Sequence, residues 1–325
     1  MSLITSIKPW RSKLMAKIGL LMNGQGSEEV GMGNDLYQNY PQYRAVIDQA
    51  SACAQLDLPA IMNDATLLGQ TRYAQPALVA MNVGINALLM AADIAVAGAI
   101  GLSLGEYAAL ITSGQLSLAD GMPLVVERGA LMQAAIGDQA HAMAAILKPD
   151  IAQVKAACAT LQAQGQQVAI ANYNSPQQIV VGGTEAGVAA LLTALPEMRA
   201  LRLPVKGAFH TVLFEQAALD FQPALDSVNF EVGDYPVISN TTAKPFTPDS
   251  IRTTLVEQMA HPTHFETGLR QLADNGVTTF IEVGPGKTLS KFARQTVPDL
   301  ARFNISNAAQ FEAVIASLKG ESVND

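Results

Sequence analysis

Short apolar runs alternate with longer amphipathic stretches in the first part of the chain. The runs at residues 17–22 and 94–100 are continuous, as expected for strands that are buried on both faces of a sheet. The stretches at 75–92 and 117–135 place apolar residues at helical spacing. Strands that alternate with helices predict an α/β domain built on a parallel sheet.

The middle of the chain follows another order of elements. We expect β-α-β-β-α-β, which is the ferredoxin-like unit. The strands are predicted at 141–147, 168–173, 178–182 and 199–205, and the helices at 150–164 and 185–195. We therefore predict an inserted ferredoxin-like subdomain at residues 137–205, with a ligand cleft between it and the larger domain.

The α/β pattern resumes after the predicted subdomain. We predict a discontinuous, α/β-hydrolase-like catalytic domain formed by residues 15–136 and 206–325. Residues 1–14 contain no long apolar core and are not a secretory signal. We interpret them as an N-terminal extension, either an upstream start or a non-native addition, and leave them out of the fold prediction. In the second part of the domain, strands are expected at 237–239 and 278–283, and helices at 211–225, 250–259, 265–275 and 288–295.

Composition narrows the class of protein and its partners. The chain has 325 residues, of which 49% are hydrophobic and 15% charged, and this indicates a well-buried globular protein. Its net charge of −8 argues against a nucleic-acid partner. Polar residues interrupt its longest apolar stretch, so we expect no membrane span. Its two cysteines form neither a disulfide framework nor a metal-binding pattern, which favours a reducing cytoplasm.

The segment Gly101-Leu-Ser-Leu-Gly-Glu-Tyr107 contains the candidate nucleophile. It follows a predicted buried strand and precedes a predicted helix, which is the context of a nucleophile elbow. Such a turn exposes Ser103 at the helix N-terminus, and the next amide, that of Leu104, can donate to an oxyanion. Glycine-rich chains also contain Gly-x-Ser-x-Gly by chance, so the strand and the helix around it carry the prediction.

A serine hydroxyl needs a base, and the chain has only four histidines. His210 is the candidate because it lies at a strand-to-helix junction of the large domain, where a helix N-terminus helps to keep the imidazole neutral. The alternative is that His210 only assists helix capping beside Thr211. No Asp or Glu stands out as its orienting partner, which weakens a Ser-His-Asp hydrolase and leaves a backbone carbonyl as acceptor. The other three are His141, His261 and His264.

Arg128 lies on a predicted helix among apolar neighbours at spacings of three and four residues. Arginine is rarely buried without a partner, so we expect either a distant carboxylate of the protein or the carboxylate of a ligand. The glycine-rich loop around Gln25 matches neither a Walker sequence nor a dinucleotide fingerprint. It is suited to presenting a backbone N–H to an oxyanion.

Seven motifs, in one order, together resemble the malonyl-CoA:acyl-carrier-protein transacylases of bacterial fatty-acid synthesis. The resemblance runs from about residue 15 to about residue 294. The motifs are Gln25-Gly-Ser, Gln75-Pro-Ala-Leu, Gly101-Leu-Ser103-Leu-Gly-Glu-Tyr, Glu127-Arg128-Gly, Asn172-Tyr-Asn174-Ser-Pro, Phe209-His210 and Glu282-Val-Gly-Pro-Gly-Lys.

The resemblance implies a ping-pong transfer through a malonyl-serine, with acyl carrier protein and malonyl-CoA as partners and with no cofactor or metal. It also implies a cytoplasmic enzyme, and we expect a monomer. The implied roles are Ser103 as nucleophile, His210 as base, the Gln258 carbonyl as its orienting acceptor, the Gln25 and Leu104 amides as oxyanion hole, and Arg128 as ligand of the malonyl carboxylate.

Two positions depart from the family pattern. Leu102 stands where histidine usually precedes the serine, and Glu28 replaces a glutamine of the glycine-rich loop. Phe209 resembles the residue of malonyl-selective members, because its bulk opposes an α-methyl branch. A patatin-like serine hydrolase or thioesterase, a transacylase for another extender unit such as methylmalonyl in polyketide assembly, and an inactive scaffold remain alternatives. Candidate docking residues for an acidic carrier protein are Arg199, Arg202, Lys206, Lys287, Lys291 and Arg294.

Overall fold

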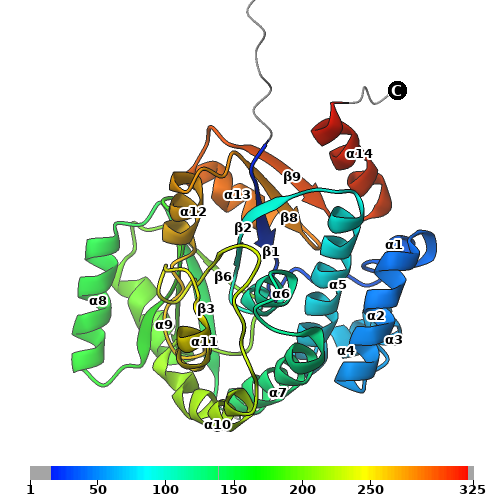
Figure 1. The fold of residues 1–325 in the computed structure, drawn as a ribbon. Coiled ribbons are helices and arrows are strands. Elements are labelled where there is room, and N and C mark those ends of the chain that lie inside the picture. Colours follow the sequence, from blue (N-terminus) through cyan, green and yellow to red (C-terminus); the bar gives the residue numbers. More distant parts are fainter. Residues whose placement is uncertain (1–15, 138, 321–325) are drawn as a thin grey trace, which may run out of the picture.

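A computed structural model describes residues 16–137 and 139–320, and the predicted N-terminal extension lies outside them. Its core is a five-stranded sheet in which every neighbouring pair of strands is parallel (Figure 1). The strands, in spatial order, are β7 Val237–Ile238, β2 Val96–Gly101, β1 Ile18–Met22, β8 Thr279–Val283 and β9 Ala301–Ile305.

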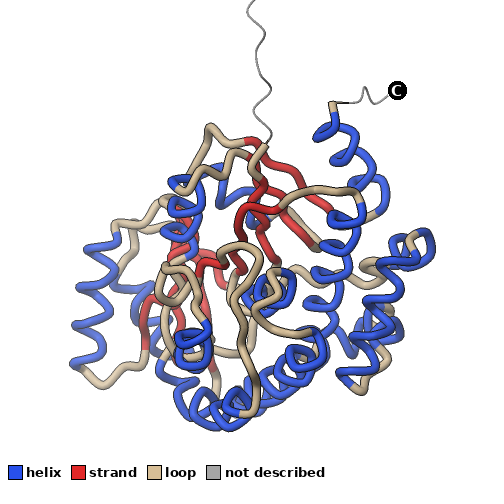
Figure 2. Tube along the Cα trace, viewed as in Figure 1, coloured by secondary structure: helices blue, strands red, loops and turns tan. Residues whose placement is uncertain are grey.

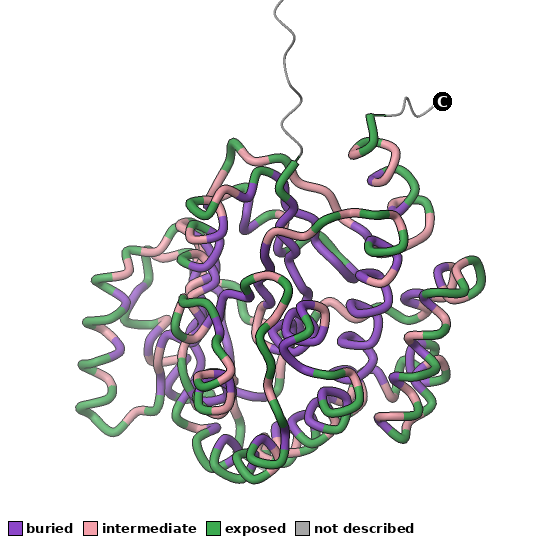
Figure 3. Tube along the Cα trace, in the orientation of Figure 1, coloured by how far each residue is buried: buried purple, intermediate pink, exposed green. Residues whose placement is uncertain are grey.

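Helices cover both faces of this sheet. Successive side chains of a strand point to opposite faces, and in the central strand β1 both sets are buried. Leu20 packs in the core formed with α5 Thr71–Ala91, α6 Gly105–Thr112 and α7 Leu118–Ile136. Leu21 packs in the core formed with α12 Phe265–Asp274 and α13 Thr288–Thr296. The central strands β1 and β8 are buried along their whole length, as the purple trace in Figure 3 shows. The helices of this part are α1 Asn34–Asn39, α2 Pro41–Ala54, α3 Leu58–Met62, α4 Ala65–Leu68, α5 Thr71–Ala91, α6 Gly105–Thr112, α7 Leu118–Ile136, η1 Val212–Phe214, α10 Glu215–Asp226, α11 Pro248–Gln258, α12 Phe265–Asp274, α13 Thr288–Thr296 and α14 Ala308–Lys319.

A second sheet is antiparallel and lies apart from the first in Figure 2. One face packs against α8 Ile151–Ala163 and α9 Glu185–Ala194. The other face presents Met143 and Val180 toward Phe209 of the large part. The strands, in spatial order, are β4 Val168–Ser175, β5 Gln178–Thr184, β3 His141–Leu147 and β6 Ala200–Arg202.

The predicted fold class, an α/β protein with a parallel sheet and a separate ferredoxin-like unit, is confirmed. The domain boundaries at 136/137 and 205/206 stay a prediction. Helix α5 is long and apolar enough to cross a membrane, but 83% of its most apolar window is buried inside the protein, as in a core helix.

Several element boundaries differ from the prediction for local reasons. Strand β6 ends at Arg202 instead of 205, because it is a half-exposed edge strand and Pro204 has no N–H to donate. Helix α5 begins at Thr71 instead of 75, which places Pro76 inside the helix. The pattern did not predict α3, α4, β9 or α14, which are short or half exposed.

Candidate active site

The nucleophile elbow forms where β2 meets α6. Ser103 has φ 52°, in the left-handed region that non-glycine residues rarely occupy. A Cβ on Gly101 would lie 1.9 Å from the carbonyl carbon of Gly105, and one on Gly105 would lie 2.1 Å from the oxygen of Met22. Only glycine fits at either position, so the two glycines allow the strand and the helix to touch and leave the serine at the apex.

His210 completes a dyad with Ser103. Its Nε2 lies 2.8 Å from the serine Oγ, and its Nδ1 lies 2.7 Å from the main-chain oxygen of Gln258. This geometry fits one tautomer, in which Nδ1–H donates to the carbonyl and Nε2 accepts from the hydroxyl. Burial, followed by the positive charge of Arg128, lowers the pKa of His210 to about 4. The imidazole is therefore neutral near pH 7, as a general base must be.

Arg128 lies beside the nucleophile and is only 1% exposed. Its Nη1 donates to Gln75 Oε1 at 2.9 Å, and its Nη2 donates to Gln258 Oε1 at 2.9 Å and to Ser103 Oγ at 3.1 Å. Its Nε is buried without a hydrogen-bond partner in the described part of the chain. None of the three ion pairs between described residues involves it. Among the described residues, Arg128 therefore has neutral oxygen acceptors and no carboxylate of the protein paired with it. This leaves the carboxylate of a ligand as the expected charged partner.

The glycine-rich loop lies against the elbow. A Cβ on Gly24 would be 2.3 Å from the oxygen of Leu102, so glycine permits this close approach. Within residues 16–137 and 139–320, the amides of Gln25 and Leu104 donate no hydrogen bond, and both residues line the same cavity. The carboxylate of Glu28 accepts from the Gly26 amide at 2.7 Å, and this contact within the loop stabilises its turn next to Gln25. The two free amides are the pair that the sequence assigned to an oxyanion hole.

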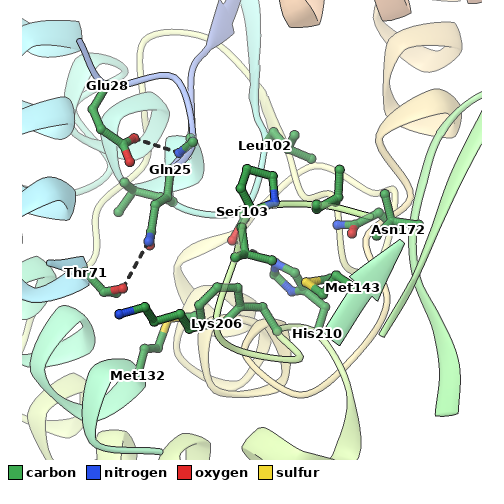
Figure 4. Close-up of a pocket in the computed structure, with 18 of the residues that line it drawn as sticks. Gln25, Glu28, Thr71, Leu102, Ser103, Met132, Met143, Asn172, Lys206 and His210 are labelled. Atoms are coloured by element: carbon green, nitrogen blue, oxygen red, sulfur yellow. Dashed lines mark hydrogen bonds between the residues drawn. The ribbon is translucent and has the colours of Figure 1, made fainter. Parts of the chain in front are cut away.

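A cavity of about 840 Å³ opens in front of Ser103, and it is lined by residues of the antiparallel sheet and of the loops that follow β1 and β2. Figure 4 shows Ser103 and His210 between Gln25 and Thr71 on one side and Met143 and Asn172 on the other. The side chain of Leu102, at the position of the usual histidine, also lines the cavity and packs with the core around α12 and α13. The apolar wall of the cavity opposite Gln25 and Thr71 includes Met143, Val180, Leu203, Val205, Phe209 and Phe292.

The sequence reasoning missed a buried network behind the dyad. Glu106 is fully buried, and its Oε2 accepts a short hydrogen bond from Nε2 of the Gln258 side chain. Burial raises the pKa of Glu106 to about 7, against the hydrogen bonds that favour its charged form. The signal was present in the sequence, because Glu106 follows the nucleophile by three residues and falls within the first turn of α6.

The chain is similar to known proteins over most of its length. Residues 20–322 match the model of the acyl transferase domain family. The malonyl CoA-acyl carrier protein transacylase of Bacillus subtilis (strain 168) is 36% identical over 316 residues, which cover 95% of this chain and all of that protein. The solved malonyl-CoA:acyl carrier protein transacylase of Xanthomonas oryzae pv. oryzae is 36% identical with a TM-score of 0.89, and the match covers 93% of this chain and 98% of that one.

A third similar structure is a complex of a malonyl-transacylase with a type II PKS acyl-carrier protein. That transacylase is 30% identical to this chain, with a TM-score of 0.88, and the match covers 94% of this chain and all of that one.

Proposed function

We propose that this chain, which belongs to the acyl transferase domain family, transfers the malonyl group of malonyl-CoA to the phosphopantetheine thiol of an acyl carrier protein. The chain is an acyltransferase. Malonyl-CoA and the carrier protein come from the names of its relatives, and the buried Arg128 beside Ser103 supports a carboxylated acyl group.

The first half of the proposed reaction acylates the serine. Ser103 Oγ attacks the thioester carbonyl while His210 Nε2 takes the hydroxyl proton, and the Gln25 and Leu104 amides hold the oxyanion. Collapse of the tetrahedral intermediate breaks the C–S bond, and His210 returns the proton to the departing thiolate of coenzyme A. The 2.8 Å separation of Nε2 and Oγ supports this assignment.

The second half reverses these roles. The carrier-protein thiol gives its proton to His210 and attacks the malonyl ester, and the Ser103 alkoxide leaves and takes that proton back. The Gln258 carbonyl orients the imidazole in both halves, because it accepts from Nδ1–H whether Nε2 is free or protonated. The free serine is thereby restored.

The observation that carries the choice of malonyl is the position of Arg128. Its Nη2 lies 3.1 Å from the nucleophilic oxygen, in a buried site with neutral acceptors only. The free carboxylate of a malonyl group on Ser103 can replace these acceptors in a bidentate pair. An acetyl group offers no such partner and leaves a buried guanidinium without a counter-ion.

The wider setting is also part of the proposal. We place the reaction in fatty-acid synthesis in the cytoplasm, catalysed by a monomer without a cofactor or metal. The two cysteines, Cys53 and Cys158, are unpaired, as suits a reducing compartment.

Intact-mass measurement after mixing with malonyl-, methylmalonyl- and acetyl-CoA tests the proposal. We expect a malonyl adduct on the protein, its absence in Ser103→Ala, and its loss when phosphopantetheinylated carrier protein is added. A malonyl adduct on Ser103→Ala would exclude Ser103 as the nucleophile. Release of free malonate without carrier protein would favour the hydrolase alternative, and an equal methylmalonyl adduct would favour a different extender unit.

A further inference from the structure

Glu106 is a buried carboxylate that the proposed chemistry does not use. It lies in the first turn of α6, and both of its oxygens are occupied. Oε1 accepts from the main-chain N–H of Asn240 at 2.5 Å, and Oε2 accepts from the carboxamide of Gln258. Asn240 in turn donates its side-chain N–H to the Gly101 oxygen at 2.8 Å, at the end of β2. A carboxylate that touches no solvent and no cation needs an explanation.

The Gln258 side chain connects Glu106 to the acyl-binding groups. Its Nε2 donates to Glu106 and to the main-chain oxygen of Ser103 at 2.9 Å, while its Oε1 accepts from Arg128 at 2.9 Å. Its main-chain oxygen accepts from His210. One residue therefore contacts the nucleophile, the base and the guanidinium, and its carboxamide must keep a defined orientation to do so.

The acceptor contacts of Glu106 set that orientation, because each of its carboxyl oxygens accepts a hydrogen bond, one of them from the Gln258 carboxamide. If the carboxamide were rotated by half a turn, its NH₂ would face the N–H groups of Arg128 and its oxygen would face the carboxylate of Glu106. Both contacts would be repulsive. A charged acceptor at Glu106 excludes this rotamer, whereas a glutamine there could donate to the rotated carboxamide and stabilise it.

Glu106 also balances the charge of Arg128 without binding it. The two charges attract each other across the Gln258 side chain, and this attraction favours the charged form of each. A direct ion pair would occupy the guanidinium and compete with a substrate carboxylate. With Gln258 between them, the guanidinium stays charged while its Nη groups meet only neutral oxygens, which a carboxylate can displace.

We propose that Glu106 is a positioning residue for the carboxylated acyl group, because it fixes the Gln258 carboxamide that holds Arg128 beside Ser103. The inference rests on the proposed malonyl transfer. It predicts that loss of the Glu106 charge acts chiefly on the discrimination between malonyl and acetyl groups.

The test compares Glu106→Gln with wild type in single-turnover acylation by malonyl-CoA and by acetyl-CoA. We expect the ratio of malonyl to acetyl kcat/KM to fall about tenfold or more, because acetyl does not use Arg128. Glu282→Gln is the matched control. Glu282 is also fully buried and accepts from the amides of Leu289 and Ser290, but it has no contact with Gln258 or Arg128. The control should leave the ratio within about twofold of wild type.

The outcomes separate this inference from the proposed function. A merely structural role of Glu106 would lower both rates equally and leave the ratio unchanged, which would overturn the inference while wild-type malonylation stands. Wild-type protein that takes up no malonyl group would overturn the proposed function and this inference with it. If Glu106→Gln does not fold, Gln258→Met replaces it. That variant keeps the main-chain oxygen and cuts the link to Arg128, so an unchanged ratio would overturn the inference in the same way.

Discussion

The two parts of the molecule contribute different kinds of surface to one cavity. The large α/β part supplies the polar side: the elbow at the end of β2, the loop after β1, His210, and Arg128 on α7. Strands β3 and β5 and residues 203–205 supply apolar groups such as Met143, Val180 and Val205, beside the polar Asn172 and Asn174 of β4. The comparison indicates that the chemistry is set on one side and the size of the acyl pocket largely on the other.

The polar side also stores strain, whereas the apolar side does not. Ser103 and His210 both have positive φ, at 52° and 61°, and both are anchored by hydrogen bonds from their neighbours. Within the described chain, none of the residues of β3, β4, β5 or β6 has positive φ. Ser103 and His210 must therefore be held in one geometry by their surroundings. We expect substitutions on the polar side to change the acylation rate by orders of magnitude, and substitutions on the apolar side to change the preference between acyl groups by less.

Arg128→Ala should break the polar side most severely. We expect malonyl transfer to fall by about a hundredfold or more, because the substrate carboxylate loses its only proposed charged partner, while relative acetyl transfer rises. Steady-state kinetics with both thioesters measures the effect. Arg270→Ala, which removes an exposed i,i+4 ion pair with Glu266, is the control and should change neither rate. Unchanged malonyl kinetics in Arg128→Ala would remove this residue from the substrate site.

The pH dependence of acylation tests the electrostatics of the same side. The pKa of His210 is lowered to about 4 by burial and by Arg128, so the neutral, competent base should persist down to about pH 4. The acid limb of kcat/KM should then lie well below the ordinary histidine pKa of about 6.5. In Arg128→Met the limb should move upward, because one of the two causes is removed, and acetyl-CoA is the suitable substrate for this measurement. A limb near 6.5 in the wild type would show that His210 is more hydrated than its burial indicates.

The sequence predicted the chemistry on this side better than the contacts behind it. Ser103 follows from a local strand-turn-helix pattern, and His210 from elimination among four histidines. The Gln258 carbonyl came only from the family resemblance, and its side-chain link to Glu106 was missed. That link joins residues 152 positions apart. Local hydrophobic periodicity does not predict that the end of α11 will contact the elbow. Strand β9 was missed for a different reason, because its edge position leaves it half exposed and its hydrophobic pattern weak.

Phe209 tests the apolar side. Its ring packs against Phe214 with centroids 5.0 Å apart and lies in the cavity wall next to the base. Phe209→Leu should raise methylmalonyl acylation relative to malonyl by about several-fold, because it opens space for an α-methyl group worth about 1–3 kcal/mol of discrimination. Competition between the two thioesters, read by intact mass, measures the shift. A preference that stays constant would place the branch discrimination elsewhere in the wall.

The weakest expected effect concerns the rim of the cavity, where the carrier protein would dock. Helix α13 contributes Thr288 and Phe292 to the cavity, and the neighbouring Lys287 and Lys291 are exposed. Their joint reversal to Glu should raise KM for an acidic carrier protein about several-fold at low salt and leave KM for malonyl-CoA unchanged, because exposed charges act mainly on encounter. Arg44→Glu combined with Lys319→Glu, on α2 and α14, makes the same change in net charge and is the control. An equal KM for the carrier protein in the Lys287/Lys291 variant and in the control would exclude α13 from the docking surface. The contrast between the polar and apolar sides of the cavity would then concern only the acyl group.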